Sequence, residues 1–340
     1  MKKLVKIFII IALILVGLFG ATSLYIDRLL KNIETTTVIS SDEAYIADEF
    51  TSQTRLSPVV NIALFGADHD GAADDNTTAE DRSDAIKVVS LNYATRKIKI
   101  TSLERDLVVW LPGIEGYDHL NHDYWRGGGN LAIQTINYNF DLDITHYVTF
   151  SYDALEKMVD AVDGVDIELT AAEANFLNAD NTTTTKHTVY EGKNHLDGYD
   201  AMQYCRIRSI DSDYGRMERQ NNVIKAVIKK CKSPLYFIKL GDICDAVLPY
   251  VTTNMTTSEI KKYLMSAIYM DISHIETYQI PSGGYQDTAS SYIGGYLLRS
   301  YTDMLYELHR NIYGENTNYS MSETTIENEK RTYATFGYPF

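Results

Sequence analysis

Residues 59–68 read VVNIALFGAD, a short apolar run that is closed by Gly66 and followed by Asp68. A run of this length bounded by a glycine predicts a buried strand, and the body of the protein is expected to begin with it. The same pattern predicts two further strands at 85–93 and 98–109, with a hairpin turn between them at 94–97. In the second of these strands isoleucines alternate with polar residues, as expected of a strand with one covered face.

Strand and helix patterns alternate through the rest of the body. Strands are predicted at 146–151, 165–169 and 271–279, and helices at 130–140, 152–162, 196–205, 217–231 and 292–313. This alternation predicts an α/β fold, a layered α/β/α sandwich around a mixed central sheet. We expect the ordered domain to span 58–313, after a polar linker at 27–57. The polar segment 314–340 is poor in aliphatic residues, which predicts a disordered tail.

The N-terminus combines three lysines with a long apolar segment. Lys2, Lys3 and Lys6 precede residues 7–26, twenty residues without a charge. Twenty helical residues at about 1.5 Å each match a hydrocarbon core of about 30 Å. The lysines favour the cytoplasm for residues 1–6, which puts the body outside the cell. A cleaved signal peptide is the alternative, but its apolar region is usually about 7–15 residues. The sequence therefore predicts an uncleaved single-pass anchor in the cell membrane.

The chain is acidic overall. It has 46 Asp and Glu against 31 Lys and Arg, a net charge of −15. This excess argues against nucleic acid as a partner, and binding of any polyanion requires a local cluster of positive charge. Three cysteines, an odd number, do not predict a disulfide framework. Cys205 is interpreted as a small buried hydrophobe rather than as a nucleophile.

Two aspartates lie at the ends of neighbouring predicted strands. Asp68 follows the first strand and Asp84 opens the second. Carboxylates brought together in this way can hold Mg²⁺ or Mn²⁺ while substrate phosphates supply the remaining ligands. The acidic loop between them does not fit an EF-hand, and on its own it is explained equally well as a solvated loop.

Arginines gather in two short segments. Arg206 and Arg208 are two residues apart, so they share a face if the chain is extended and diverge if it is helical. Arg216, Arg219 and Gln220 lie together in the first turn of a predicted helix, where free backbone N–H groups favour an anion. Ion pairs with nearby acidic residues would explain that segment equally well on its own. Because arginine keeps its charge and binds phosphate oxygens with forked donors, the set indicates a site for a multiply charged phosphate ester.

Arg105 and Asp106 stand side by side toward the end of the predicted strand 98–109. The arginine can bind phosphate while the aspartate accepts the proton of an attacking hydroxyl, the division of roles found in transfer of a phosphoryl group to a hydroxyl. A structural Arg–Asp pair is the alternative.

In order and spacing these motifs resemble the LytR-CpsA-Psr family of membrane-anchored cell-wall phosphotransferases, from about residue 61 to residue 232. The resemblance is carried by Gly66-Ala67-Asp68, Arg82-Ser83-Asp84, Leu103-Glu104-Arg105-Asp106, His119-Leu120-Asn121, Asp163-Gly164-Val165-Asp166, Leu196-Asp197-Gly198 with Ala201, Tyr204-Cys205-Arg206-Ile207-Arg208 and the segment from Asp213 to Gln220. The chain departs from the usual pattern at Glu104, where the family has proline, and at Asp163, where it has glycine. The loop 68–84 is also longer than usual.

The resemblance implies an α/β/α domain with a deep apolar pocket for a polyprenyl tail. It implies transfer of a glycopolymer, such as teichoic acid or capsule polysaccharide, from a polyprenyl-pyrophosphate carrier to a peptidoglycan sugar hydroxyl. Arg105 and Asp106 would be catalytic, and Asp68 and Asp84 would hold Mg²⁺ or Mn²⁺. The pyrophosphate would be bound by Arg82, Arg105, Arg206, Arg208, Arg216, Arg219 and Gln220.

Two other functions fit the same residues. A hydrolase would release the polymer to water with the same arginines and metal. A non-catalytic lipid- or wall-binding protein would act as a regulator or attenuator. Members of the family have been labelled transcriptional regulators, but the predicted anchor and the charge of −15 argue against direct DNA binding.

Overall fold

The structure is a computed structural model. It describes residues 27–28, 30–37, 39–40, 42–48, 58–67, 82–179, 184–231, 233, 239–267, 269–282, 286–288, 295–298, 301–315 and 317–336. Within these ranges no helix has both the length and the apolar character needed to cross a membrane. The predicted anchor at 7–26 lies outside the described residues.

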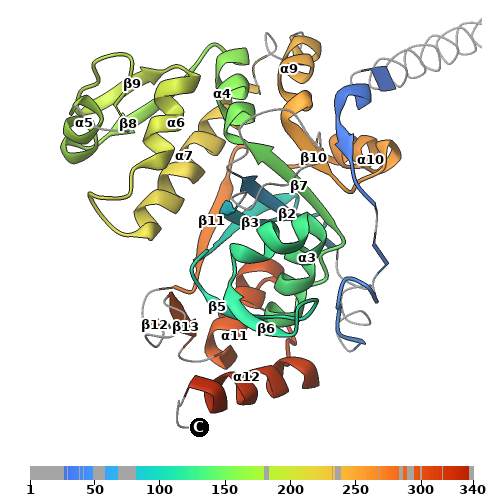
Figure 1. Ribbon diagram of the computed structural model, residues 1–340. Coiled ribbons are helices and arrows are strands. Elements are labelled where there is room, and N and C mark those ends of the chain that lie inside the picture. The colour runs from blue at the N-terminus through green and yellow to red at the C-terminus, as the bar shows by residue number, and fades with distance from the viewer. Residues whose placement is uncertain are drawn as a thin grey trace, which may run out of the picture.

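A seven-stranded mixed sheet forms the centre of the domain (Figure 1). Its strands are β1 (Glu34–Thr35), β2 (Val59–Ala67), β3 (Ser83–Asn92), β4 (Lys97–Leu103), β7 (His146–Ser151), β10 (Val251–Thr253) and β11 (Ile275–Ile280). Their order in the sheet is β1-β10-β7-β2-β3-β4-β11. At the end of β2, Ala67 pairs with Ser83 at the start of β3 and with Ser151 at the end of β7. Three strand ends therefore meet at one edge, and the predicted mixed α/β fold is confirmed.

Helices cover both faces of this sheet. One face packs against α3 (His122–Phe140) and α11 (Tyr301–Tyr313) around a large apolar core. The other face is covered by α4 (Tyr152–Ala161), α6 (Gly198–Arg206) and α7 (Asp213–Cys231). Alternation along β3 divides its side chains between the faces, since Ile86 and Val88 join the core and Lys87 and Val89 point the other way.

Smaller elements complete the domain. The strands β8 (Val165–Leu169) and β9 (Gly192–Leu196) form an antiparallel pair with α5 (Ala171–Asn178) between them in sequence, and β5 (Val108–Leu111) pairs with β6 (Gly116–His119). The remaining elements are η1 (Leu30–Asn32), α9 (Leu240–Val247), η2 (Leu248–Tyr250), α10 (Thr257–Ala267), β12 (Gln286–Thr288), β13 (Tyr296–Leu298) and α12 (Glu323–Phe336).

The predicted strand at 98–109 is two strands. Pairing of β4 with β11 ends at Leu103 and Ile280, and the backbone N–H of Glu104 donates to Ile280 at 2.8 Å. The chain then turns, with the N–H of Leu107 donating to the carbonyl of Glu104 at 3.4 Å, and enters β5. As a result, Arg105 and Asp106 lie in a turn at the end of the sheet rather than within a strand.

Two predicted helices also have different bounds. α3 begins at His122, eight residues earlier than expected, and is kinked at Gly127 and Gly128, whose backbone angles are not helical. A side chain at Gly129 would meet the ring of Tyr147 at 2.3 Å, so glycine allows the close approach of α3 to β7. The helix predicted at 292–313 begins only at Tyr301, after the short strand β13.

The prediction of a disordered tail at 314–340 is wrong for most of that segment. It contains α12, which Ser322 caps by accepting from the N–H of Thr325 at 3.1 Å. Asp141 of the loop after α3 accepts hydrogen bonds from Ser322 and Thr325 at 2.6 Å each. Buried Thr325, Asn328, Thr332 and Tyr333 form the packed face of α12. The prediction of disorder rested on the lack of aliphatic residues. The structure shows instead that hydrogen bonds between buried polar groups hold α12 against the domain.

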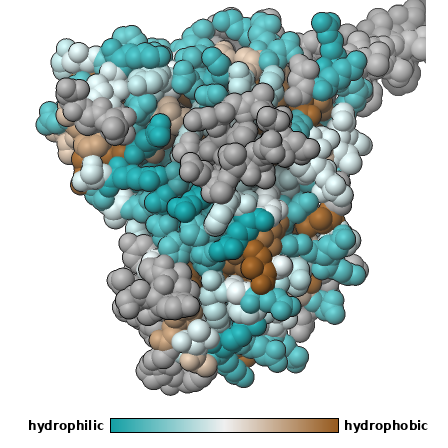
Figure 2. Space-filling view, viewed as in Figure 1, coloured by the Kyte–Doolittle hydropathy of each residue, from teal (hydrophilic) through white to brown (hydrophobic). Residues whose placement is uncertain are grey.

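Part of the predicted linker at 27–57 belongs to the domain. Its residues 34–35 form β1 at one edge of the sheet, and Leu30 and Ala44 are buried. Figure 2 shows that hydrophilic residues predominate on the face of the molecule drawn there, as the acidic composition leads one to expect.

Candidate functional site

Asp84, the second residue of β3, is the centre of a cluster of arginines. Its partners come from four segments of the chain, namely Arg105, Tyr152, Arg208 and Arg216. The Asp84 carboxylate forms an ion pair with Arg105, and it accepts from Arg208 at 2.5 Å and from the Tyr152 hydroxyl at 2.8 Å. Nη1 of Arg216 lies 3.7 Å away. Burial alone would raise the pKa of Asp84, but these three guanidinium groups and the Tyr152 hydroxyl hold it below its ordinary value.

Several polar atoms of this cluster are buried without a hydrogen bond to any part of the chain that the structure describes. They are Nε and Nη1 of Arg216, Nε of Arg105 and Oε1 of Gln220. Arg216 is only 1% exposed, and its Nη2 atom is held by Asp213 at 2.7 Å. Buried guanidinium donors without acceptors are strongly unfavourable, so the site is suited to an anion that accepts from them.

Two other predicted anion ligands, Arg206 and Arg82, lie at the border of this cluster. Arg206 is exposed at the end of α6, and its guanidinium lies 5.2 Å from the centroid of the Tyr152 ring. Arg82 is exposed immediately before β3. Burial lowers the pKa of His122, and the charge of Arg82 adds to that lowering. In the part of the chain that the structure describes, the ion pairs of Asp84 are with Arg105, Arg208 and Arg216 and not with these two arginines.

The structure argues against Arg219 as an anion ligand. Its side chain is buried, with Nε donating to Glu173 at 2.8 Å and Nη1 donating to the carbonyl of Ile207 at 3.1 Å. Its Nη2 atom binds Asp211. All three nitrogens are engaged, and Arg219 therefore fastens α7 to α5 and to the segment after α6. Spacing along the helix predicted a shared face with Arg216, but partners distant in sequence bind Arg219 instead.

Asp106 lies beside the cluster, with its carboxylate 3.4 Å from Nε of Arg105. The neighbouring Glu104 is fully buried, and burial followed by the nearby Asp213 and Asp106 raises its pKa to about 8. A carboxyl group with a raised pKa therefore lies next to the carboxylates that the arginines bind.

An apolar pocket of about 320 Å³ adjoins the arginine cluster. It lies between the sheet and helices α4, α6 and α7. Its apolar lining is Leu64, Phe65, Ala85, Val89, Leu91, Ile98, Ile100, Phe150, Leu155, Met158, Met202, Ile224, Val227 and Ile228. Arg206, Arg208, Arg216 and Gln220 also line it, so charged and apolar surfaces are continuous. Such a space fits an amphiphile with an anionic head group and a hydrocarbon tail.

A lysine lies in the wall of this apolar pocket. Lys87 is fully buried and donates to Oγ of Ser102 and Oδ1 of Asn221, both at 2.9 Å. Burial lowers its pKa to about 7. Burial also raises the pKa of the neighbouring Cys205 thiol to about 12, which fits its interpretation as an unreactive hydrophobe.

The donor set at Asp84 is compatible with a divalent cation. Asp84 is kept ionised, its side chain is 15% exposed, and it stands where the end of β2 meets the start of β3. Hard cations such as Mg²⁺ prefer carboxylate oxygens of this kind. The second predicted ligand, Asp68, lies outside the described residues.

Three contributors were not predicted from the sequence, namely Tyr152, Asp213 and Lys87. Tyr152 follows β7 directly, just as Asp68 follows β2, and parallel pairing of these two strands brings their ends together. The position of Tyr152 directly after a predicted strand was the sequence signal that could have identified it. Asp213 is part of the motif 213–220 in the sequence, and in the structure it anchors Arg216. A lysine between apolar residues of a strand was the signal for Lys87.

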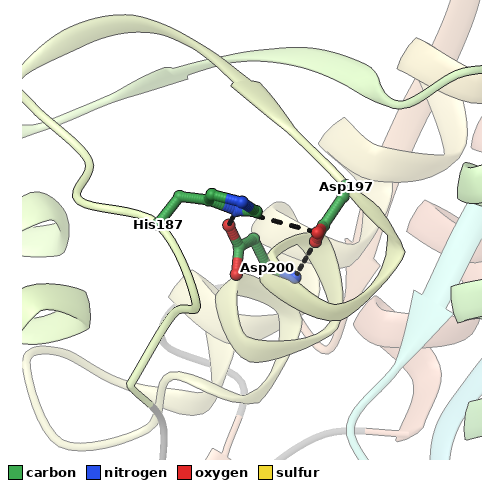
Figure 3. A group of neighbouring side chains, drawn as sticks. All are labelled: His187, Asp197 and Asp200. Carbon is green, nitrogen blue, oxygen red and sulfur yellow. Dashed lines mark hydrogen bonds and ion pairs between the residues drawn. The ribbon is translucent and has the colours of Figure 1, made fainter.

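A second group of possible metal ligands, His187, Asp197 and Asp200, is explained by its structural contacts (Figure 3). Asp197 caps α6 by accepting from the N–H of Asp200 at 2.8 Å. The buried carboxylate of Asp200 accepts from the N–H of Lys186 at 2.7 Å and contacts Nδ1 of His187 at 2.8 Å. That hydrogen bond raises the pKa of His187. The group fastens the loop before β9 to the start of α6, at the opposite end of that helix from Arg206.

Comparison with known proteins relates the chain to cell-wall proteins. The polyisoprenyl-teichoic acid–peptidoglycan teichoic acid transferase TagU of Bacillus cereus (strain AH820) is 32% identical over 233 residues, covering 68% of this chain and 71% of that protein. The structure of gbs0355 from Streptococcus agalactiae has a TM-score of 0.63 at 24% identity, covering 78% of this chain and 91% of that one.

A third relative has been solved with a lipid. Bacillus subtilis YwtF (TagT) with bound octaprenyl pyrophosphate has a TM-score of 0.56 at 22% identity, covering 75% of this chain and 90% of that one. These structural likenesses establish a shared fold. The sequence profile of the LytR_cpsA_psr family matches residues 29–308, and the chain belongs to that family.

Proposed function

We propose that this protein transfers a glycopolymer from a polyprenyl-pyrophosphate carrier to a sugar hydroxyl of peptidoglycan by metal-assisted phosphoryl transfer. The observation that carries the proposal is the apolar pocket that adjoins the arginine cluster at Asp84. The names of its relatives, teichoic acid transferases, support the same class of reaction.

The two parts of the pocket suit the two parts of the carrier. A polyprenyl tail would fill the apolar space, where each buried CH₂ contributes about 0.8 kcal/mol. The pyrophosphate would accept from Arg208 and Arg216, including the donors of Arg216 that have no acceptor among the described residues. Arg206 and Arg82 would bind outer oxygens from the border of the cluster.

Asp84 and Asp68 are the residues that we assign to Mg²⁺ or Mn²⁺. The ion, when bound, would neutralise negative charge on the phosphoryl oxygens. Asp84 is suited to this role because its neighbours keep it ionised.

The reaction forms a bond between the sugar oxygen and the phosphorus that carries the polymer. The bond from that phosphorus to the bridging oxygen breaks, and polyprenyl phosphate leaves with the electron pair. Asp106 would accept the proton of the sugar hydroxyl, while Arg105, 3.4 Å away, would hold the phosphoryl group. Because phosphoryl transfer depends mainly on positioning and charge, the arginines are expected to contribute more than the base.

The proposal includes a location. An anchor at 7–26 would hold the domain on the outer side of the cell membrane, next to its lipid carrier and to peptidoglycan. The net charge of −15 gives no support to nucleic acid as a partner.

The test is a product analysis. Purified full-length protein would be incubated in detergent with a radiolabelled polyprenyl-pyrophosphate glycan and Mg²⁺, with and without peptidoglycan. Label in peptidoglycan together with released polyprenyl phosphate supports the transferase. Free polymer released at equal rate without acceptor would identify a hydrolase, and carrier binding without any cleavage would identify a non-catalytic protein.

A matched pair of variants connects this activity to the site. Arg208→Ala removes an exposed arginine that binds Asp84, and it should weaken carrier binding about tenfold or more. Arg310→Ala removes an exposed arginine of α11, on the other face of the sheet, and serves as the control. Equal affinity in the two variants would contradict the assignment of the pyrophosphate site.

A further inference from the structure

A lysine interrupts the apolar wall of the pocket. Lys87 of β3 is fully buried and lines the pocket, and its Nζ atom donates to Oγ of Ser102 and to Oδ1 of Asn221, both at 2.9 Å. Among the described residues no carboxylate forms an ion pair with it. An ammonium group has three N–H donors, and these two acceptors use only two of them. Because a buried cation without a counter-ion is costly, a functional reason for a lysine at this place is expected.

Polar and apolar side chains follow one order along the strands that form the pocket floor. Asp84 is the second residue of β3, at the edge of the sheet, and Lys87 comes three residues later, about 10 Å along the strand. Lys87 is paired with Ser102 of β4. The pocket-lining pairs beyond it are apolar, namely Val89 with Ile100 and Leu91 with Ile98. Lys87 and Ser102 are therefore the last polar pair before the apolar part of the pocket.

Helix α7 has the same order along another wall of the pocket. Arg216 lies near its start, and Gln220 and Asn221 follow about one turn later. The pocket-lining residues of α7 beyond them are Ile224, Val227 and Ile228. Because Asn221 accepts from Lys87, the lysine lies between the level of Arg216 and the apolar part.

This order determines the direction in which a polyprenyl-pyrophosphate carrier would lie. Its tail would fill the apolar part, so the phosphate bonded to the lipid would come next to Lys87. The phosphate bonded to the polymer would then lie nearer to Arg105 and Asp106, outside the apolar part. In the proposed transfer the lipid-side phosphate is the leaving group, and it takes the electron pair of the bond that breaks. Negative charge therefore develops on the phosphate nearest to the lysine.

We propose that Lys87 binds the lipid-side phosphate of a polyprenyl ligand, and that its ammonium group stabilises this phosphate as it leaves in the transfer reaction. The first part concerns binding alone, and the second rests on the proposed function. The ammonium group donates a hydrogen bond to a phosphate oxygen and keeps its proton, so the reaction written above is unchanged.

The surroundings of Lys87 favour such a contact. A charge-assisted hydrogen bond is strong where apolar walls exclude water. Burial lowers the pKa of Lys87 to about 7 in the empty pocket, and a phosphate beside the amine would favour its charged form.

The experiment compares the binding of two probes to the full-length protein in detergent at pH 7. Geranylgeranyl phosphate has the proposed head group, and geranylgeraniol has the same tail with a hydroxyl group in its place. The ratio of their dissociation constants reports on the phosphate, because a change in the shape of the pocket affects both probes. Lys87→Met removes the amine and keeps a flexible apolar side chain that can fill the same space.

We expect wild type to prefer the phosphate, and Lys87→Met should reduce that preference about tenfold or more. Lys225→Met is the matched control. Lys225 is a partly buried lysine of α7 that donates to Oγ1 of Thr277 at 2.9 Å, and it is not among the residues that line the pocket. This control should keep the wild-type preference.

Two results would overturn the proposal. One is an equal preference for the phosphate in wild type and Lys87→Met, which would make the lysine a structural residue. The other is an equal reduction in Lys87→Met and Lys225→Met, which would indicate a general effect of charge. If Lys87→Met does not fold, Lys87→Gln, which keeps a polar group without the charge, decides by the same ratio.

A transfer assay separates this proposal from the proposed function. At saturating carrier, kcat of Lys87→Met should be about tenfold or more below that of wild type, because the hydrogen bond strengthens as charge develops. An unchanged kcat would overturn the role at the leaving phosphate. If wild type transfers no polymer but its preference for the phosphate depends on Lys87, the proposed function fails while the phosphate site stands.

Discussion

Replacement of Lys87 by methionine should change the way in which stability depends on pH. In the folded protein Lys87 is fully buried in the pocket wall, and burial lowers its pKa from the ordinary 10.5 to about 7. Between these two values the unfolded chain holds a proton that the folded chain has lost. The free energy of unfolding therefore rises with pH over this window.

The size of this effect follows from the two pKa values. One pKa unit corresponds to about 1.4 kcal/mol, so a change from 10.5 to about 7 corresponds to about 5 kcal/mol. Lys87→Met removes this contribution. It also removes two hydrogen bonds, but Nδ2 of Asn221 already lies 3.3 Å from Oγ of Ser102, so these groups can bind each other. The variant should be more stable than wild type at pH 6, and the advantage should shrink by about 4 kcal/mol between pH 6 and pH 10.

The assay is urea unfolding at several values between pH 6 and pH 10, followed by circular dichroism. Lys157→Met, which removes an exposed lysine of α4, is the control for a simple loss of charge. A stability difference between Lys87→Met and wild type that stays constant with pH, or grows toward alkaline pH, would refute the reasoning. It would mean that Lys87 keeps its charge inside the pocket.

Four further substitutions test other parts of the structure. Asp106→Asn should lower turnover and leave carrier binding nearly intact, whereas Arg105→Ala should weaken both, as measured by transfer rate and carrier affinity. Asp84→Asn should abolish the binding of Mn²⁺ in the presence of pyrophosphate, measured by calorimetry, because a neutral amide replaces the ionised carboxylate. Asp141→Ala should lower the free energy of unfolding by about 3 kcal/mol or more, measured in urea, because the buried donors of α12 lose their acceptor.

Each of these expectations has a contrary outcome. Loss of carrier binding in Asp106→Asn would make Asp106 an anchor for Arg105 rather than a base. Unchanged Mn²⁺ affinity in Asp84→Asn would remove Asp84 from the metal site. Full stability of Asp141→Ala would mean that α12 is held by its other contacts.

The central strands could be predicted because local patterns determine them. In β3 and β4, alternation of apolar residues assigns each side chain to a face, and both strands begin within two residues of their predicted starts. The end of β4 could not be predicted in this way. No glycine or proline interrupts 98–109, and the strand ends at Leu103 because its pairing with β11, far along the chain, ends at Ile280.

The arginine site could be predicted in part for a similar reason. The strand ends and the helix start that carry Asp84, Arg105 and Arg216 are local features, and the structure brings them together. Arg219 has the same local features as Arg216. Its role is set by Glu173, 46 residues away, which sequence spacing does not reveal.

The pairing of β1 with β10 fixes the N-terminal end of the ordered domain at Glu34, so it limits the length of chain between the sheet and the predicted anchor at 7–26. The start of β1 at Glu34 is only seven residue steps from position 27, and a fully extended chain spans at most about 3.6 Å per residue. For a protein anchored through residues 7–26, the edge of the sheet therefore stays within about 25 Å of the bilayer surface. An anchor at 7–26 would therefore hold the domain close to the membrane. A carrier lipid would then have to move only a short distance out of the bilayer to enter the pocket. The peptidoglycan acceptor would have to lie within a similar distance of the membrane.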